Sequence, residues 1–130
     1  MRIKNVVMSS QNIILEKSYN FGLRTVKLYM HLRKNKVERE LLIQFLKCGT
    51  SVGANVEEAE GGQSLNDFIH KIGIAYKEAR EAHYWLRLLR DSELLELKLA
   101  NSFIQDAEEI KKILASILKT SKAKERSPKK

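Results

Sequence analysis

Apolar residues recur along this chain at alternating steps of three and four positions, the spacing that places side chains on one face of an α-helix. The pattern predicts four long helices, over about residues 10–34, 37–60, 65–90 and 95–119. In the last three helices, one periodic series marks the face expected to be buried. These series are Leu41, Phe45, Cys48, Val52, Asn55 and Ala59, then Leu65, Ile69, Ile72, Tyr76, Ala79, His83 and Leu86, and then Phe103, Ala107, Ile110, Leu114 and Ile117.

Short polar or glycine-containing connections separate the helices. Asn35 is expected to end the first helix, and Gly61-Gly62 the second, because glycine tolerates the left-handed backbone of a helix cap. Ser64 is expected to cap the third helix, with Asp67 three residues later as a variant of the capping box. Long helices with short connections predict an all-α protein, an up-down-up-down antiparallel four-helix bundle.

The two ends of the chain fall outside the predicted bundle, which covers residues 10–119. Residues 1–9 are expected to form a separate N-terminal segment, and the Lys- and Ser-rich residues 120–130 a basic disordered tail. The net charge of +8 gathers near both ends: residues 1–36 carry eight basic residues and one acidic residue, and residues 119–130 six and one. Such an excess attracts polyanions, nucleic acid first among them, although basic surfaces also serve solubility alone.

The first helix carries two apolar stripes on nearly opposite sides of its helical wheel. The broader stripe is expected to face the core, and it consists of Leu15, Tyr19, Gly22, Leu23, Val26, Tyr29 and Met30. The other stripe consists of Ile14, Phe21, Leu28 and Leu32. Because an exposed apolar stripe is costly on a monomer, this second stripe predicts a subunit interface in a homo-oligomer. The alternative is a bundle wide enough to bury part of both stripes.

A ridge of basic residues runs beside the second stripe and, with the Lys-rich C-terminus, forms the predicted nucleic-acid-binding surface. Its members are Lys17, Arg24, Lys27, His31 and Lys34 in the first helix, and Lys119, Lys122, Lys124 and Arg126 near the C-terminus. These side chains are expected to contact the phosphates of structured RNA or DNA, with little reading of the bases.

The second helix contains poor helix formers, including Gly49 and Gly53, which persist in a helix when tertiary packing dominates. Since these glycines lie four residues apart, another helix can approach closely along their line. A structural polar row is predicted nearby, formed by Ser51, Asn55 and Glu58 and, from the third helix, by Glu78 and Glu81. We interpret the row as tight packing with hydrogen bonds between these two helices; the alternative is a small polar binding site.

The segment around the second connection resembles a known family signature. It reads Ser51-Val52-Gly53-Ala54-Asn55, Glu58, Gly61-Gly62-Gln63-Ser64, Asp67-Phe68-Ile69, Ile74-Ala75, Lys77-Glu78-Ala79-Arg80-Glu81 and Tyr84-Trp85-Leu86-Arg87-Leu88-Leu89. Over about residues 15–120 the chain resembles the four-helix-bundle family of 23S rRNA intervening-sequence proteins, which is itself similar to the accessory variability protein of diversity-generating retroelements. The resemblance implies a bacterial bundle that assembles into a homopentamer, and it supplies no catalytic residue. Many members have a proline where this chain has Asn35-Lys36-Val37.

The sequence specifies no catalytic or cofactor site. A di-metal site in a bundle needs two Glu-x-x-His pairs, and only Asp67 and His70 come close to forming one. Cys48 lies on the predicted core face, where a thiol acts as a small apolar group. The turn from Gly61 to Ser64 could offer backbone N–H groups to an anion, but helix capping accounts for the same residues.

Together these features predict a non-enzymatic, oligomeric nucleic-acid-binding accessory protein without cofactor, metal or identified small-molecule substrate. A protein–protein interaction scaffold without nucleic acid is the alternative. Tyr84 and Trp85 could stack on bases, but on a bundle helix they are expected to pack. No apolar run is long enough to span a membrane, no signal-peptide pattern is present, and a single cysteine excludes an internal disulfide, so the expected location is the cytoplasm.

Overall fold

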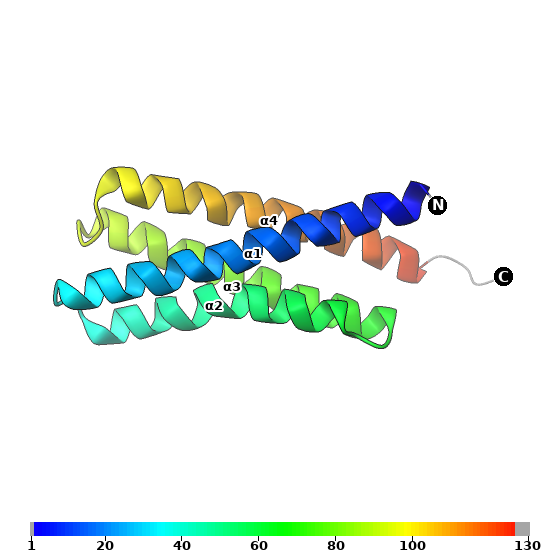
Figure 1. Cartoon of the computed structure of the whole chain (residues 1–130), viewed down its shortest axis with the longest axis horizontal. Coiled ribbons are helices and arrows are strands. Elements are labelled where there is room, and N and C mark those ends of the chain that lie inside the picture. Colours follow the sequence, from blue (N-terminus) through cyan, green and yellow to red (C-terminus); the bar gives the residue numbers. More distant parts are fainter. Residues whose placement is uncertain (1, 127–130) are drawn as a thin grey trace.

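The computed structural model describes residues 2–126, which form four α-helices. They are α1 (Arg2–Lys34), α2 (Arg39–Glu60), α3 (Leu65–Asp91) and α4 (Leu97–Arg126). The helices run antiparallel, and the start of α1 lies at the same end of the molecule as the end of α4 (Figure 1). No strand occurs in the described range, so the predicted all-α four-helix bundle is confirmed.

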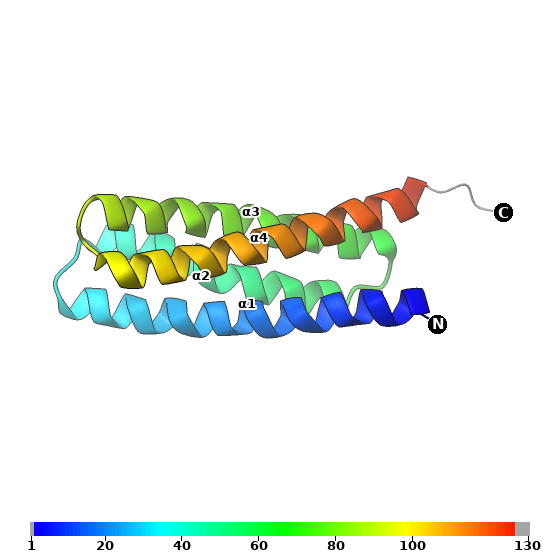
Figure 2. The same ribbon diagram turned by 90° about the horizontal axis from the view of Figure 1, so that it is seen from above.

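Each helix packs on its neighbour in the chain, and α1 closes the bundle against α4. Of the neighbouring pairs, α1 and α4 contact each other most sparsely. These two helices cross at an angle in Figure 1, and in Figure 2 they separate toward the end that holds the termini. The seam between α1 and α4 is therefore the most open edge of the bundle.

A cluster of three phenylalanine rings joins three of the helices. The ring of Phe103 in α4 lies edge-on to those of Phe21 in α1 and Phe45 in α2, with centroids 4.9 and 5.7 Å away. All three side chains are at most 2% exposed. Burying a side chain of this size contributes roughly 1.5–3 kcal/mol, so this cluster is a major source of bundle stability.

The core positions predicted for α4 are confirmed, and those for α2 and α3 are confirmed in part. All five residues of the α4 series are buried. Buried members of the other two series are Phe45, Cys48, Val52 and Ala59 in α2, and Ile72, Ala79 and Leu86 in α3.

The buried face of α1 is the opposite of the predicted one. The stripe predicted to be a subunit interface is at most 5% exposed and belongs to the core: Ile14, Phe21, Leu28 and Leu32. Four members of the predicted core stripe are instead 44–61% exposed: Tyr19, Leu23, Val26 and Met30. The prediction of an interface at the second stripe is therefore wrong, and the apolar surface of α1 lies on its other side.

Two small polar residues on α1 explain this reversal. Ser18 and Thr25 are buried on the core face, and their hydroxyls donate to the carbonyl oxygens of Leu15 and Phe21 at 3.3 and 2.8 Å. Because their own helix satisfies both hydroxyls, burying them carries little penalty. A series read from apolar residues alone omits these two positions, and the true core face then looks narrower than the exposed one.

The small side chains on α1 face the two mid-helix glycines of α2. A Cβ atom on Gly53 would lie 3.1 Å from the carbonyl oxygen of Ser18, and one on Gly49 would lie 2.5 Å from Cγ2 of Thr25. The predicted close approach of another helix is thus confirmed, and that helix is α1.

The ends of the chain are more helical than predicted. α1 begins at Arg2 and α4 continues to Arg126, so residues 2–9 of the predicted N-terminal segment and residues 120–126 of the predicted tail are helical. Lys, Arg and Glu are good helix formers, and basic residues in a last turn interact favourably with the helix dipole. The predicted disorder is therefore wrong as far as Arg126, and residues 127–130 lie outside the described range.

The turn between α2 and α3 contains the predicted residues, but its glycines act differently. Gly61 has φ −82°, so no left-handed glycine ends α2. Gly62 is needed for space, because a Cβ there would lie 3.0 Å from the carbonyl oxygen of Ala59. The predicted cap on α3 is confirmed: the Ser64 hydroxyl accepts a hydrogen bond from the backbone N–H of Asp67 at 3.1 Å.

Candidate nucleic-acid interface

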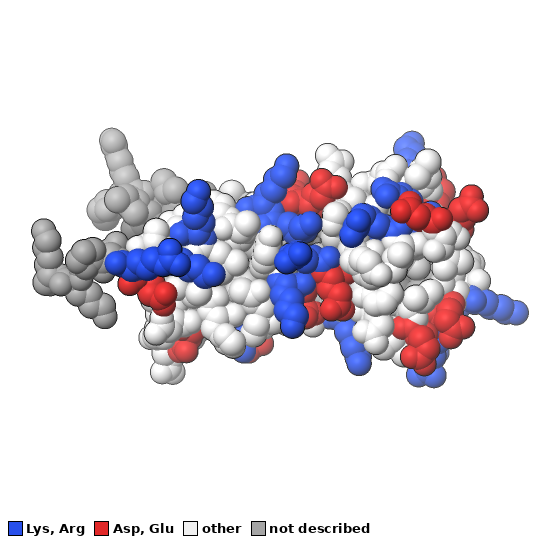
Figure 3. Space-filling view, turned by 180° about the vertical axis from the view of Figure 1, so that it is seen from behind, with Lys and Arg blue, Asp and Glu red and all other residues white. Residues whose placement is uncertain are grey.

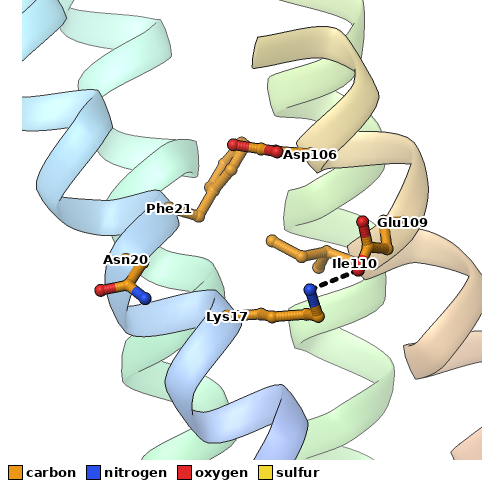
Figure 4. A pocket seen from close by; sticks show the side chains of 6 residues that line it. All are labelled: Lys17, Asn20, Phe21, Asp106, Glu109 and Ile110. Atoms are coloured by element: carbon orange, nitrogen blue, oxygen red, sulfur yellow. Dashed lines mark ion pairs between the residues drawn. The ribbon is translucent and has the colours of Figure 1, made fainter. Parts of the chain in front are cut away.

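Two of the predicted phosphate-binding residues on α1 point at acidic residues of α4. The ammonium group of Lys17 pairs with the carboxylate of Glu109, and Figure 4 shows these side chains meeting across the seam. Arg24 pairs with Asp106 at 2.5 Å. Both pairs are partly exposed, so solvent weakens each of them and neither contributes much to stability. In this structure Lys17 and Arg24 join α1 to α4, and their charges are already neutralised.

The guanidinium group of Arg24 is held on three sides. One nitrogen pairs with Asp106, another donates to the hydroxyl of Ser102 at 3.2 Å, and the central carbon lies 4.6 Å from the centroid of the Phe103 ring. Contact between a cation and an aromatic face is favourable, and the planar guanidinium suits it. Arg24 therefore presents a flat cation whose orientation is fixed by α4.

The remaining basic residues of the α1 ridge are free of ion pairs within the described chain. Lys27, His31 and Lys34 are exposed, and the only polar contact among them is between the His31 ring and the Asn35 side chain at 3.3 Å. These three residues form a basic group, the α1 group, at the end of the seam opposite the termini. Their side chains are available to an anion.

A hollow of about 300 Å³ opens between α1 and α4 beside the α1 group. It is lined by Arg24, Lys27, Leu28, His31, Leu99 and Phe103. Leu28 and Phe103 are buried beneath it, and Leu99 is half-buried. The hollow thus combines an apolar floor with a cationic rim.

The second basic group lies near the C-terminal end of α4, and its members are Lys119, Lys122, Lys124 and Arg126. All four are exposed and make no ion pair within the described residues. Lys119 follows Glu109 by ten residues and Lys27 follows Lys17 by ten, in antiparallel helices joined by the Lys17–Glu109 pair. At 1.5 Å per residue, the nearest members of the two groups, Lys27 and Lys119, lie about 30 Å apart along the bundle. Without Lys17 and Arg24, which are paired, the predicted surface is therefore two separate groups at opposite ends of the seam, one on α1 and one in the C-terminal part of α4.

The face of the molecule opposite to the view in Figure 1 carries charges of both signs. Lys and Arg side chains there are interspersed with Asp and Glu over most of the length of the bundle (Figure 3). Such a mixed surface offers no extended cationic track to a polyanion. The two basic groups of the α1–α4 seam are consequently the stronger candidates for phosphate contact.

An apolar groove marks a different surface, between α1 and α2. Its volume is about 460 Å³, and it is lined by Ser18, Tyr19, Gly22, Leu23, Val26, Thr50, Gly53, Ala54 and Glu57. The exposed stripe of α1 forms one wall, and small residues of α2 form the other. Contiguous exposed apolar surface of this kind typically marks an interaction site.

The predicted polar row consists of local contacts. The side chain of Asn55 donates to the carbonyl oxygen of Ser51 at 2.8 Å, within α2 itself. Glu58 pairs with Lys71 of α3 at 3.0 Å. The predicted hydrogen bonds from α2 to the glutamates of α3 do not occur among the described residues, so this row does not form a connected site.

The two glutamates of α3 lie close to the buried thiol of Cys48. Burial, and then the charges of Glu81 and Glu78, raise the pKa of Cys48 to about 12. Burial and the neighbouring Glu81 likewise raise the pKa of Glu78. A thiol that stays protonated is a poor nucleophile, so Cys48 acts as a core residue. Within the described part of the chain, no three His, Cys, Asp or Glu side chains gather closely enough to hold a metal ion.

Tyr84 is exposed, although the sequence predicts that it packs. Tyr84 is 47% exposed, and the guanidinium carbon of Arg87 lies 5.9 Å from the centroid of its ring. Trp85 is half-buried and packs against the core, as predicted. The spacing of the two arginines Arg80 and Arg87 around Tyr84 was the available signal, because together they mark the outer face of α3.

Fold and surface together define an all-α class of protein: an antiparallel bundle with two unpaired basic groups along one seam and an apolar groove on another. No helix within the described range combines the length and the apolar character that a membrane crossing requires.

The family model for 23S rRNA-intervening sequence proteins matches residues 10–116 of this chain. The chain therefore belongs to this family, as the resemblance of its sequence predicted. The chain is similar to the crystal structure of a protein with unknown function from the S23 ribosomal protein family of Bacteroides thetaiotaomicron. The two share 44% identity and a TM-score of 0.82, over 85% of this chain and 98% of that one. No curated protein matches the chain. Similarity to the accessory variability protein stays a prediction.

Proposed function

We propose that this protein is a non-enzymatic, homo-oligomeric accessory protein that binds structured RNA or DNA through its phosphates. The proposal is carried by two basic groups that make no ion pair within the described residues: Lys27, His31 and Lys34 on α1, and Lys119, Lys122, Lys124 and Arg126 on α4. Each neutralised phosphate releases counterions, which is the main source of sequence-independent affinity. The distance of about 30 Å between their nearest members, Lys27 and Lys119, is close to the roughly 34 Å of one turn of B-form duplex, so both groups can reach one backbone.

The proposal includes self-association through the apolar groove between α1 and α2. Leu23, Val26 and Met30 are each at least 44% exposed, which is unfavourable in an isolated subunit. At Gly22, no described atom outside its own helix lies within 4 Å of the Cβ position, which leaves room for a neighbouring helix. A second copy covering this groove would bring further basic groups into one assembly, and the family resemblance implies five subunits.

Binding is tested with a fluorescently labelled RNA hairpin and a labelled DNA duplex by fluorescence anisotropy. We expect Lys119→Gln, Lys122→Gln and Lys124→Gln combined to weaken binding strongly at low salt. The matched control neutralises Lys47, Lys98 and Lys112, which are also exposed and free of ion pairs within the described residues. The proposal is wrong if the wild-type protein binds neither probe. It is also wrong if the control variant binds the probes as weakly as the first variant does. Substitution is preferable to truncation, because Ser121 is only 9% exposed in this part of α4.

Assembly is tested by sedimentation velocity on Leu23→Glu. A charge in the groove should reduce the sedimenting mass to that of one subunit, while far-ultraviolet circular dichroism stays that of a helical bundle. Leu97→Glu is the control, because Leu97 is 64% exposed and lies outside the groove. Equal masses for wild type and Leu23→Glu would exclude this groove as the contact between copies.

A protein-interaction scaffold is the second candidate. The observation in its favour is the exposed Tyr84 flanked by Arg87 and Leu88, since Tyr and Arg are enriched among residues that dominate protein interfaces. It predicts a protein partner that stays bound after nuclease treatment and at high salt, and that is lost in Tyr84→Ala.

A further inference from the structure

We infer that the hollow between α1 and α4 binds an unpaired nucleobase, so that the protein prefers single-stranded segments of RNA or DNA over duplex. The inference rests on the proposed nucleic-acid binding and names the part of the nucleic acid that enters this site. It concerns the hollow of about 300 Å³ whose floor is Leu28, Leu99 and Phe103 and whose rim is Arg24, Lys27 and His31.

The floor of the hollow favours a flat apolar group. Leu28 and Phe103 are buried beneath it and Leu99 is half-buried, so the surface that an occupant would cover carries almost no polar group. Polar side chains line only the rim. A base that enters the hollow would remove apolar surface of its own from water.

Arg24 supplies a planar stacking surface on the wall of the hollow. Its guanidinium is fixed by Asp106 at 2.5 Å, by Ser102 at 3.2 Å and by the Phe103 ring at 4.6 Å. Bases of unpaired nucleic acid stack on aromatic rings and on arginine planes. Because α4 already orders the side chain of Arg24, this side chain loses little further conformational entropy when a base stacks on it.

The charge of the rim selects an anion. Asp106 is the acidic residue nearest to Arg24, and Arg24 itself neutralises it. Lys27 and His31 make no ion pair within the described residues and stand beside the hollow, where the phosphates on either side of an inserted base would lie. The rim therefore complements a nucleotide rather than an uncharged aromatic molecule.

A base-paired nucleotide does not satisfy this site. Its two faces are stacked on neighbours and its edge is hydrogen-bonded, so it would have to leave the helix before entering. That step costs a few kcal/mol and is avoided in single strands. The geometry thus predicts tighter binding of single-stranded than of duplex probes at equal length and salt.

The test uses a short oligonucleotide containing 2-aminopurine, a fluorescent base, either alone or paired with its complement. Stacking of an unpaired base on a protein side chain strengthens binding, so wild type should bind the single strand about tenfold more tightly than the duplex and change the 2-aminopurine fluorescence. Leu99→Trp fills the hollow without changing charge, and it should abolish the preference while duplex affinity is retained. Leu97→Trp adds the same ring two residues away, outside the hollow, and should keep the preference.

Arg24→Lys is the second variant, because it keeps the positive charge but loses the plane. It should reduce the single-strand preference without changing the salt dependence of binding, so the inference stays testable if Leu99→Trp does not fold. Equal affinity of wild type for single strand and duplex, or a preference that survives both variants, overturns the inference and leaves the proposed function standing. Displacement of the oligonucleotide by polyglutamate but not by adenosine monophosphate also overturns it, in favour of an acidic protein partner. Failure to bind any nucleic acid removes the proposed function first.

Discussion

Replacing Gly49 by alanine tests the close packing of α1 on α2. A Cβ atom there would lie 2.5 Å from Cγ2 of Thr25 and nearer still to its hydroxyl oxygen. Thr25 cannot turn away easily, because it is fully buried, it is β-branched, and its hydroxyl donates to the carbonyl oxygen of Phe21 at 2.8 Å. The two helices must therefore move apart, or Thr25 must adopt a strained rotamer.

Two opposing effects set the size of the change. Alanine is about 1 kcal/mol better than glycine inside a helix, whereas overpacking a tight core costs about 1–3 kcal/mol. At Gly49 both effects act, and the net result should be destabilisation by up to about 2 kcal/mol. Gly73 in α3 is the matched control: no described atom outside its own helix lies within 4 Å of its Cβ position, so Gly73→Ala should be stabilising by about 1 kcal/mol. The two variants should differ by about 1–3 kcal/mol.

Urea unfolding followed by circular dichroism at one fixed protein concentration measures this difference, since self-association would otherwise shift the apparent stability. Combining Gly49→Ala with Thr25→Ala removes the crowded atoms, and the two substitutions should be coupled by at least about 1 kcal/mol in a double-mutant cycle. If Gly49→Ala proves as stabilising as Gly73→Ala, then α1 and α2 do not pack closely at Gly49.

Three further predictions follow from individual residues. Cys48, with its pKa raised to about 12 by burial, should not react with a thiol reagent at neutral pH until the protein unfolds. Glu93, two residues after the end of α3, has a left-handed backbone with φ 60°, and the N–H of Leu94 donates to the carbonyl oxygen of Leu89 at 3.0 Å. Because glycine adopts this conformation without strain, Glu93→Gly should keep this cap and raise the melting temperature by about 3 °C. Burial, with Lys111 and Arg87, lowers the pKa of His83 below 6.5, so the neutral ring favours the folded state. The free energy of unfolding should thus decrease as the pH falls below 6.5 through the folded-state pKa. In His83→Gln, the free energy of unfolding should depend less on pH over this range.

The sequence predicted the architecture well because α4 and α3 each have one apolar face. The series from Phe103 to Ile117 is entirely buried, and the cap at Ser64 forms as its spacing indicates. Two mid-helix glycines likewise predicted a close helix approach, since poor helix formers survive only where packing demands them. For these elements the local pattern and the tertiary contacts agree.

The sequence could not identify the core face of α1, because that helix is apolar on both sides. Ser18 and Thr25 hide the true face, and their burial depends on backbone hydrogen bonds that an apolar pattern does not reveal. The prediction of the nucleic-acid interface fails in part for the same reason, because tertiary contacts decide which of its residues are paired. Which lysines are free and which are paired depends on α4, and nothing in the spacing of α1 shows that Lys17 meets Glu109.

A salt titration of duplex DNA binding tests the central proposal most directly. The slope of log affinity against log salt falls by about 0.9 for each phosphate contact removed, so Lys27→Gln with Lys34→Gln should reduce it by about 1.8. Lys17→Gln, which removes a charge already paired with Glu109, should leave the slope unchanged. One common slope for all three proteins, or a Lys17→Gln slope that falls by as much per residue, would contradict phosphate binding by the unpaired lysines of α1.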